Sequence, residues 1–117
     1  MCLLFFSVGA VADTTPGVSI PQTEEEKQTR KVITTYKKVL ALFPHRRDSD
    51  MLLYQLAKAH VLKGEDDAAI QALTRLTIDF PDSTLVSEAN YRLGDIYFNL
   101  ERYRDSETAF GAVIKSG

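Results

Sequence analysis

Apolar residues recur every three or four positions along most of the chain, the spacing that places them on one side of an α-helix. The first such stretch runs from Thr23 to Phe43 and stops at Pro44. Thr23 and Glu26 form a capping-box pattern at its start. No stretch alternates apolar and polar residues over the length of a strand, so the pattern predicts an all-α fold without a sheet.

Four more helices are predicted after Pro44. They cover about residues 51–63, 65–80, 85–100 and 103–117. Residues 48–50 and 82–84 offer N-cap side chains for two of them. Gly64 can end the first of the four, and Glu101-Arg102 forms the turn before the last.

These helices repeat with an offset of 37 residues. Phe43-Pro44 recurs as Phe80-Pro81, and Tyr54 recurs as Tyr91. Further matched pairs, in the same chemical classes, are Leu56 and Leu93, Ala57 and Gly94, His60 and Tyr97, Ala69 and Ser106, Leu73 and Phe110, and Leu76 and Val113. A repeat of this length predicts a helical solenoid, in which each hairpin of helices buries the apolar face of the next.

The matched positions have a packing interpretation. Ala57 and Gly94 are small on the first helix of each pair, and Ala69 and Ser106 are small on the second, so the two helices can approach closely. Larger side chains fill the space beside these contacts: Leu56, Leu73, Leu93 and Phe110. His60 stands where Tyr97 stands in the copy, and we expect a packed aromatic substitute rather than a ligand or an acid/base group.

The pattern Leu93-Gly94-x-x-Tyr97, followed by Glu101, Ser106 and Phe110, resembles the tetratricopeptide repeat family. The earlier copy carries the same resemblance at Leu56, Ala57, His60, Gly64, Ala69, Leu73 and Pro81. It covers about residues 24–117, although the family period is about 34 residues. The resemblance implies a right-handed α-α superhelix of helix-turn-helix repeats. Its parts would be a half repeat at 24–44 and repeats at 48–81 and 83–117, with further repeats C-terminal to residue 117.

The segment Asp79-Phe80-Pro81-Asp82-Ser83 is similar to sequences from the envelope-associated branch of that family. This branch includes the periplasmic coordinator of the Tol-Pal system and the assembly lipoprotein of the outer-membrane barrel machinery. The similarity implies a bacterial envelope location and an indirect association with the outer membrane.

Members of the family bind extended peptides or partner helices on the concave face, which the first helices line. Carried over by position, that face would present Tyr54, Lys58, Tyr91, Asp95 and Asn99. Tyrosine and asparagine suit such a face because they combine contact area with hydrogen bonding. The alternative is that these five are ordinary solvent-facing positions.

The N-terminus is typical of an export signal. Leu3 to Val11 is apolar or small except for Ser7, and nine residues are too few for a bilayer span of about 20. Ala10-Val11-Ala12 supplies a small-x-small cleavage pattern, which would leave residues 13–23 as a flexible linker rich in Thr, Pro and Gly. No Lys or Arg precedes the apolar run. It could instead be a buried or interfacial segment of a cytoplasmic protein.

Composition excludes several classes of function. The 117 residues carry a net charge of −2, so no overall positive field favours nucleic acid. Cys2 is the single cysteine, and a lipobox would need an apolar stretch before it. His45 and His60 lack a zinc-site spacing, and no phosphate loop or GxSxG motif occurs. We therefore expect no metal, no cofactor and no catalysis.

The sequence favours a non-enzymatic scaffold of the bacterial cell envelope that binds a protein or peptide partner. By the 37-residue offset the next proline would fall just beyond Gly117, so we expect the N-terminal part of a longer array. Two alternatives remain. One is a structural spacer in a large envelope assembly, and the other is an accessory repeat region of a larger enzyme.

Overall fold

The structure, a computed structural model, describes residues 23–116, and all regular structure in that range is helical. The helices are α2 (Glu24–Leu42), α3 (Ser49–Leu62), α4 (Asp66–Asp79), α5 (Val86–Asn99) and α6 (Tyr103–Ser116). The all-α prediction is therefore confirmed. The predicted signal remnant at 1–12 and nearly all of the linker at 13–23 lie outside the described residues.

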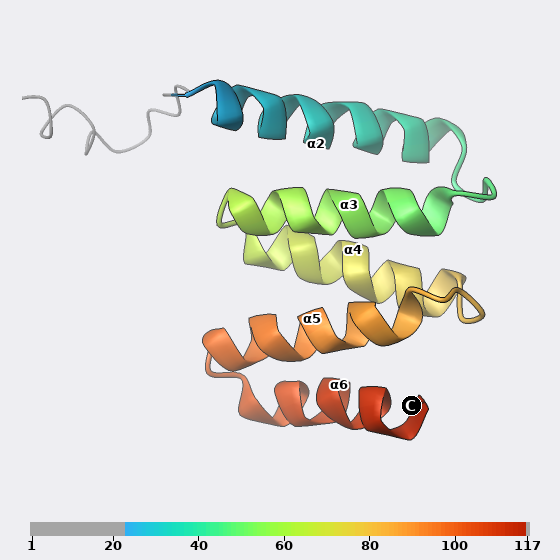
Figure 1. The fold of residues 1–117 in the computed structure, drawn as a ribbon, viewed down its shortest axis with the longest axis vertical. Coiled ribbons are helices and arrows are strands. Elements are labelled where there is room, and N and C mark those ends of the chain that lie inside the picture. The colour runs from blue at the N-terminus through green and yellow to red at the C-terminus, as the bar shows by residue number, and fades with distance from the viewer. Residues whose placement is uncertain (1–22, 117) are drawn as a thin grey trace, which may run out of the picture.

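The helices form a single stack in chain order (Figure 1). Each helix runs antiparallel to the one before it and packs on it: α2 on α3, α3 on α4, α4 on α5 and α5 on α6. The stack measures 61 × 35 × 20 Å. Because contacts run mainly between consecutive helices, the chain is a helical solenoid rather than a globule around one central core.

Helix α2 begins with the predicted capping box. The amide of Glu26 donates to Thr23 Oγ1 at 3.1 Å, and the amide of Thr23 donates to Glu26 Oε1 at 3.3 Å. These two bonds satisfy amides that have no partner inside the helix. At the other end, α2 stops one residue before Phe43-Pro44, and α4 stops one residue before Phe80-Pro81. Proline cannot continue either helix, and it disfavours the helical conformation of the residue before it.

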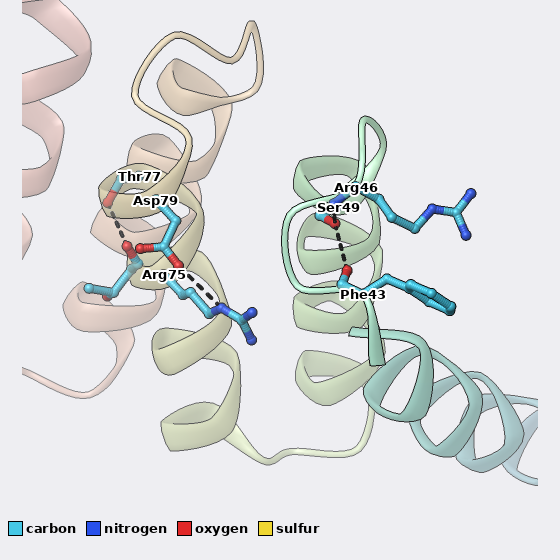
Figure 2. Close-up of polar contacts among 7 residues, drawn as sticks. Phe43, Arg46, Ser49, Arg75, Thr77 and Asp79 are labelled. Carbon is cyan, nitrogen blue, oxygen red and sulfur yellow. Dashed lines mark hydrogen bonds and ion pairs between the residues drawn. The ribbon is translucent and has the colours of Figure 1, made fainter. Parts of the chain in front are cut away.

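The predicted caps of α3 and α5 differ from the structure. Ser49 lies inside α3 and is buried, and its hydroxyl closes the preceding loop instead of capping the helix (Figure 2). It accepts from the Arg46 amide at 2.8 Å and donates to the Phe43 carbonyl at 3.2 Å. Ser83 has a related role before α5, where it accepts from the Leu85 amide at 3.0 Å. The two proline loops are thus closed by serine side chains.

The two hairpin turns use matched residues in the left-handed backbone region. Gly64 has φ +75° between α3 and α4, and Glu101 has φ +63° between α5 and α6. The two positions are 37 residues apart. Glycine adopts this conformation without steric cost, whereas glutamate there is strained by about 1–2 kcal/mol. Both turns allow the second helix of the pair to fold back on the first.

The core follows the repeat. The buried apolar residues on α3 and α4 include Leu53, Leu56, Ala57, Ala69, Leu73 and Leu76. Those on α5 and α6 include Ala89, Leu93, Ile96 and Ala109. Gly94 and Ser106 are also buried, Tyr97 and Phe110 are half-buried, and Pro81 is exposed in its loop. The small residues lie where the two helices of each pair meet.

Helices α5 and α6 approach each other closely at Gly94. A Cβ atom built on Gly94 would lie 2.5 Å from two ring atoms of Phe110, closer than real Cβ contacts allow. Beside this contact, Ser106 Oγ donates to the Gly94 carbonyl at 2.8 Å. Helix α6 therefore packs directly against the backbone of α5, and only glycine at residue 94 permits this.

Replacing Gly94 with alanine should destabilise the fold by about 1–3 kcal/mol, because the Phe110 ring must move. Gly111→Ala is the matched control, since nothing lies within 4 Å of a Cβ at Gly111. In a helix this control should gain up to about 1 kcal/mol. Urea unfolding of both variants measures the difference. Equal stabilities would contradict the close approach.

Candidate functional site

Tyr54 is the least accessible of the five residues predicted to face a binding partner. Its side chain is only 7% exposed. Its hydroxyl donates to Glu88 Oε2 at 3.1 Å and accepts from Arg92 Nε at 2.6 Å. Tyr54 on α3 therefore joins two repeats through α5 and is not the open contact position that the sequence suggested.

Two cations lie against the ring of Tyr54. Lys58 Nζ is 5.5 Å and Arg92 Cζ is 5.4 Å from the ring centroid, both within the range of cation–π attraction. Arg92 Nε also lies 3.6 Å from Glu88 Oε2. Lys58 is half-buried, so its ammonium borders this cluster and still reaches solvent.

The three predicted residues of α5 are exposed. Tyr91, Asp95 and Asn99 follow one another at four-residue spacing, which places them along one side of the helix. Tyr91 is 54% exposed, and its ring touches Phe110 at a centroid distance of 5.6 Å. Among residues 23–116, no hydrogen bond or ion pair engages the side chains of Asp95 and Asn99. Their role in binding stays a prediction.

The different exposure of Tyr54 and Tyr91 has a simple cause. The two occupy the same position in successive repeats, but α5 covers Tyr54 with Glu88 and Arg92. Within the described part of the chain, no helix stands in that place beside Tyr91. The same residue type is therefore a core residue in one repeat and a surface residue in the next.

Sequence reasoning missed Glu88 and Arg92. They lie 34 and 38 residues after Tyr54, close to the repeat length of 37. In a solenoid, residues separated by about one repeat lie beside each other on neighbouring helices. A search for polar pairs at one repeat length, plus or minus one helical turn, would have found this cluster.

A second polar link joins the first turn of α3 to the proline loop that precedes α5. Ser83 Oγ donates to Asp50 Oδ2 at 2.5 Å, 33 residues away in sequence. The Ser83 hydroxyl also accepts a hydrogen bond from the Leu85 amide, so the same hydroxyl positions the start of α5. Together with the Tyr54 cluster, this bond fixes α5 against α3.

His60 has a structural environment. It is 5% exposed, and Nδ1 donates to Glu65 Oε1 at 2.8 Å across the hairpin turn. This hydrogen bond holds the pKa of the Glu65 carboxyl below its ordinary value, and the Lys63 ammonium at 3.6 Å acts in the same direction. The ring ties the end of α3 to the start of α4. The position is occupied by a packed ring, as expected, but the hydrogen bond to Glu65 was not foreseen.

Two kinds of site were searched for among the described residues. Residues 23–116 contain no group of three or more His, Cys, Asp or Glu that could hold a metal ion. In the same range, no helix has the length and apolar character needed to cross a membrane. What the surface does present is a row of polar and aromatic side chains on α5 next to the Tyr54 cluster, which suits recognition of another molecule by contact.

Removing the Tyr54 hydroxyl tests whether the polar cluster holds the repeats together. Tyr54→Phe should lower stability by about 1 kcal/mol, because Glu88 and Arg92 lose their shared partner. Tyr91→Phe should change it little, since the described residues give its hydroxyl no hydrogen bond. Thermal unfolding of both variants is the measurement. Identical midpoints would show that the cluster contributes nothing.

The comparisons with known families agree with this geometry. Two models, both described as Tetratricopeptide repeat, match residues 52–83 and 87–116. The first match spans most of α3, α4 and the second proline loop, and the second spans α5 and α6. Together they cover more than half of the chain. Comparison with curated proteins gives no match. Both repeats of this solenoid are thus recognised independently, and the chain belongs to the tetratricopeptide repeat family.

Proposed function

We propose that this protein is a non-catalytic scaffold that binds a protein partner on the side of the stack formed by the first helices, α3 and α5. Tetratricopeptide repeats are consistent with protein–protein interaction. The partner would contact Lys58 together with the exposed residues of α5. Further repeats after residue 117 would extend the same surface.

One observation carries this proposal: the side of α5 that bears Asp95 and Asn99 is exposed, and within residues 23–116 its polar side chains have no partner. Tyr91 adds an aromatic ring at one end of that row, with 54% of its surface exposed. Tyrosine combines a large apolar contact area with a hydroxyl that can form a hydrogen bond, and it is enriched among the residues that dominate binding energy at interfaces. The proposal therefore assigns the contact to the exposed side of α5.

We also propose that the protein is located in the bacterial cell envelope. Three sequence features support this location. They are the apolar run Leu3–Val11, the cleavage pattern at residues 10–12 and the segment at residues 79–83 that is similar to the envelope-associated branch of the family. An envelope location would limit the partners to envelope proteins, with an indirect association with the outer membrane.

A structural spacer is a second candidate function. The exposed apolar and aromatic side chains on α5 and α6 favour it. Ile114 is 79% exposed, and Tyr91 and Phe110 lie on the same terminal pair of helices. An apolar end of this kind suits stacking on another repeat. Ile114→Glu separates the candidates, because only a spacer should lose assembly while the α5 surface still binds its partner.

The scaffold proposal is tested by charge reversal on α5. A photo-reactive residue at Asn99 first captures the partner in living cells, and the partner is then purified. Asp95→Lys should weaken its affinity at least about tenfold, a loss near 1.4 kcal/mol, without lowering the melting temperature. Glu107→Lys on the exposed face of α6 is the control with the same charge change. Unchanged affinity for Asp95→Lys would remove α5 from the binding surface.

The proposed location is tested by the intact mass of the protein recovered from separated cell fractions. A periplasmic species that begins at Asp13 is expected if Ala10-Val11-Ala12 is cleaved. A cytoplasmic species that retains Met1 would contradict export. In that case Leu3–Val11 would belong to the fold or to an interface.

A further inference from the structure

Helix α2 forms one end of the stack and packs mainly on α3 (Figure 1). Its buried residues are Ile33 and Leu40. Within residues 23–116, no other helix covers the opposite side of α2, and the side chains there are exposed. These side chains therefore decide what the α2 end of the stack can contact.

That side of α2 is basic. Lys27, Lys31 and Lys38 lie along it, because they are four and seven residues apart, and all three are exposed. Arg30 and Lys37 flank them and are exposed as well. After the first turn of α2, the helix contains no acidic residue. We call these five cations the basic face of α2.

The rest of the stack has the opposite charge. Residues 24–47 contain seven Lys or Arg and three Glu, a net charge of +4. Residues 48–116 contain seven Lys or Arg and twelve Asp or Glu, a net charge of −5. An anionic surface would therefore attract the α2 end and repel the other helices, so that the protein approaches it in one orientation.

The protein itself engages the basic face only lightly. Lys27 Nζ lies 3.4 Å from Glu24 Oε2, and 59% and 83% of the two side chains are exposed. In the described range, no ion pair engages Lys31, Lys37 or Lys38. An exposed pair such as that of Lys27 contributes little to stability. The basic face can therefore bind an anionic surface without breaking a contact on which the fold depends.

Repeat packing does not require these cations. One repeat later, on α4, the five positions of the basic face are occupied by Gly64, Asp67, Ala68, Thr74 and Arg75. Only one of these residues is a cation, and one is an anion. Helix α4 nevertheless packs on α3, as α2 does. The charge of the basic face therefore needs an explanation other than folding.

Exposed apolar side chains stand at the C-terminal end of the basic face. Leu42 is 66% exposed and follows Lys38 by four residues, so both lie on the same side of α2. Phe43 is 52% exposed, and Arg46 Cζ lies 5.8 Å from its ring centroid. Figure 2 shows the side chains of Phe43 and Arg46 extending in the same direction. A bilayer offers phosphates to the cations and acyl chains to the apolar groups, whereas the backbone of a nucleic-acid duplex offers only phosphates.

We propose that the basic face of α2 binds the surface of a bilayer that contains anionic phospholipids. The cations lie among the headgroup phosphates, and Leu42 and Phe43 enter the interface beside them. From Lys27 to Leu42 the helix extends about 22 Å, so its row of cations suits a flat surface. A cluster of about four to eight Lys or Arg on an amphipathic helix is typical of binding to anionic lipids.

This binding mode leaves the proposed contact on α5 accessible. With α2 on the bilayer, the stack extends away from the surface, and α5 and α6 are farthest from it (Figure 1). The row of Tyr91, Asp95 and Asn99 then faces solvent, where a protein partner can reach it. The lipid contact goes beyond the proposed scaffold function and shares no residue with it, so either proposal can fail without the other.

The first test is flotation of the full-length protein with lipid vesicles. Vesicles of phosphatidylcholine and phosphatidylglycerol should bind the protein at least about tenfold more tightly than vesicles of phosphatidylcholine alone, since each Lys or Arg near an anionic surface adds attraction. About 1 M salt should abolish this difference, because it shortens the Debye length to about 3 Å.

The basic face is tested by the variant Lys31→Gln/Lys38→Gln. It should bind the phosphatidylglycerol vesicles at least about tenfold more weakly than the wild type. The matched control, Arg104→Gln/Lys115→Gln, removes the same charge from exposed positions on α6 and should bind like the wild type. Because all four positions are exposed, circular dichroism should give both variants the melting temperature of the wild type.

The position of Leu42 can be followed by fluorescence, because the chain contains no tryptophan. The emission of Leu42→Trp should shift to shorter wavelength when phosphatidylglycerol vesicles are added. Ile114→Trp is the control on α6, where the native side chain is 79% exposed, and its emission should not shift. Unchanged emission of bound Leu42→Trp would contradict the placement of α2 on the bilayer.

Three further results would overturn the proposal. One is equal affinity for the two vesicle compositions, and another is an equal loss of binding in the α6 control variant. The third is binding of a double-stranded DNA oligonucleotide that depends on Lys31 and Lys38 while the phosphatidylglycerol vesicles do not bind. That result would assign the basic face to a nucleic acid instead.

Discussion

The close contact between Gly94 and the Phe110 ring is the constraint on which the second repeat depends. It brings α6 against the backbone of α5, so that Ser106 can bond the Gly94 carbonyl at 2.8 Å. Ala57 and Ala69 occupy the matching positions in the first repeat and are buried. Two helices held this closely form a thin hairpin that cannot enclose a core by itself, so each hairpin must stack on another.

Polar bonds between repeats then fix how the hairpins stack. Tyr54 reaches Glu88 and Arg92 at the middle of the first helices, and Asp50 reaches Ser83 at the loops. Apolar packing alone is not directional, whereas these bonds specify one arrangement of α5 against α3. The result is an extended stack that presents different surfaces on different sides. The exposed row of Tyr91, Asp95 and Asn99 on α5 is one such surface.

Much of the fold was predictable from sequence because it depends on local and repeated signals. The capping box at Thr23, the stop at Gly64 and the turn at Glu101 all occur where the pattern placed them. The small residues at 57, 94, 69 and 106 were recognised from the 37-residue offset alone. Such features are set by neighbours along the chain or by comparison of the chain with itself.

The rest depends on which residues meet across the stack, and sequence does not state this directly. The sequence suggested residues 48–50 as N-cap candidates for the helix that follows, but the hydroxyl of Ser49 instead closes the loop before α3. The resemblance to the family placed Tyr54 on an open contact face, yet Tyr54 is 7% exposed and its hydroxyl bonds Glu88 and Arg92 of α5.

In this solenoid, each helix is stabilised mainly by the helices packed directly against it. Native-state amide hydrogen exchange, resolved helix by helix, tests it most directly. Within residues 23–116, α3, α4 and α5 have a packed neighbour on both sides and should exchange most slowly, and α2 and α6, with one packed neighbour each in that range, should exchange faster. Equal protection of all five helices would contradict nearest-neighbour stacking and would show a single cooperative core instead.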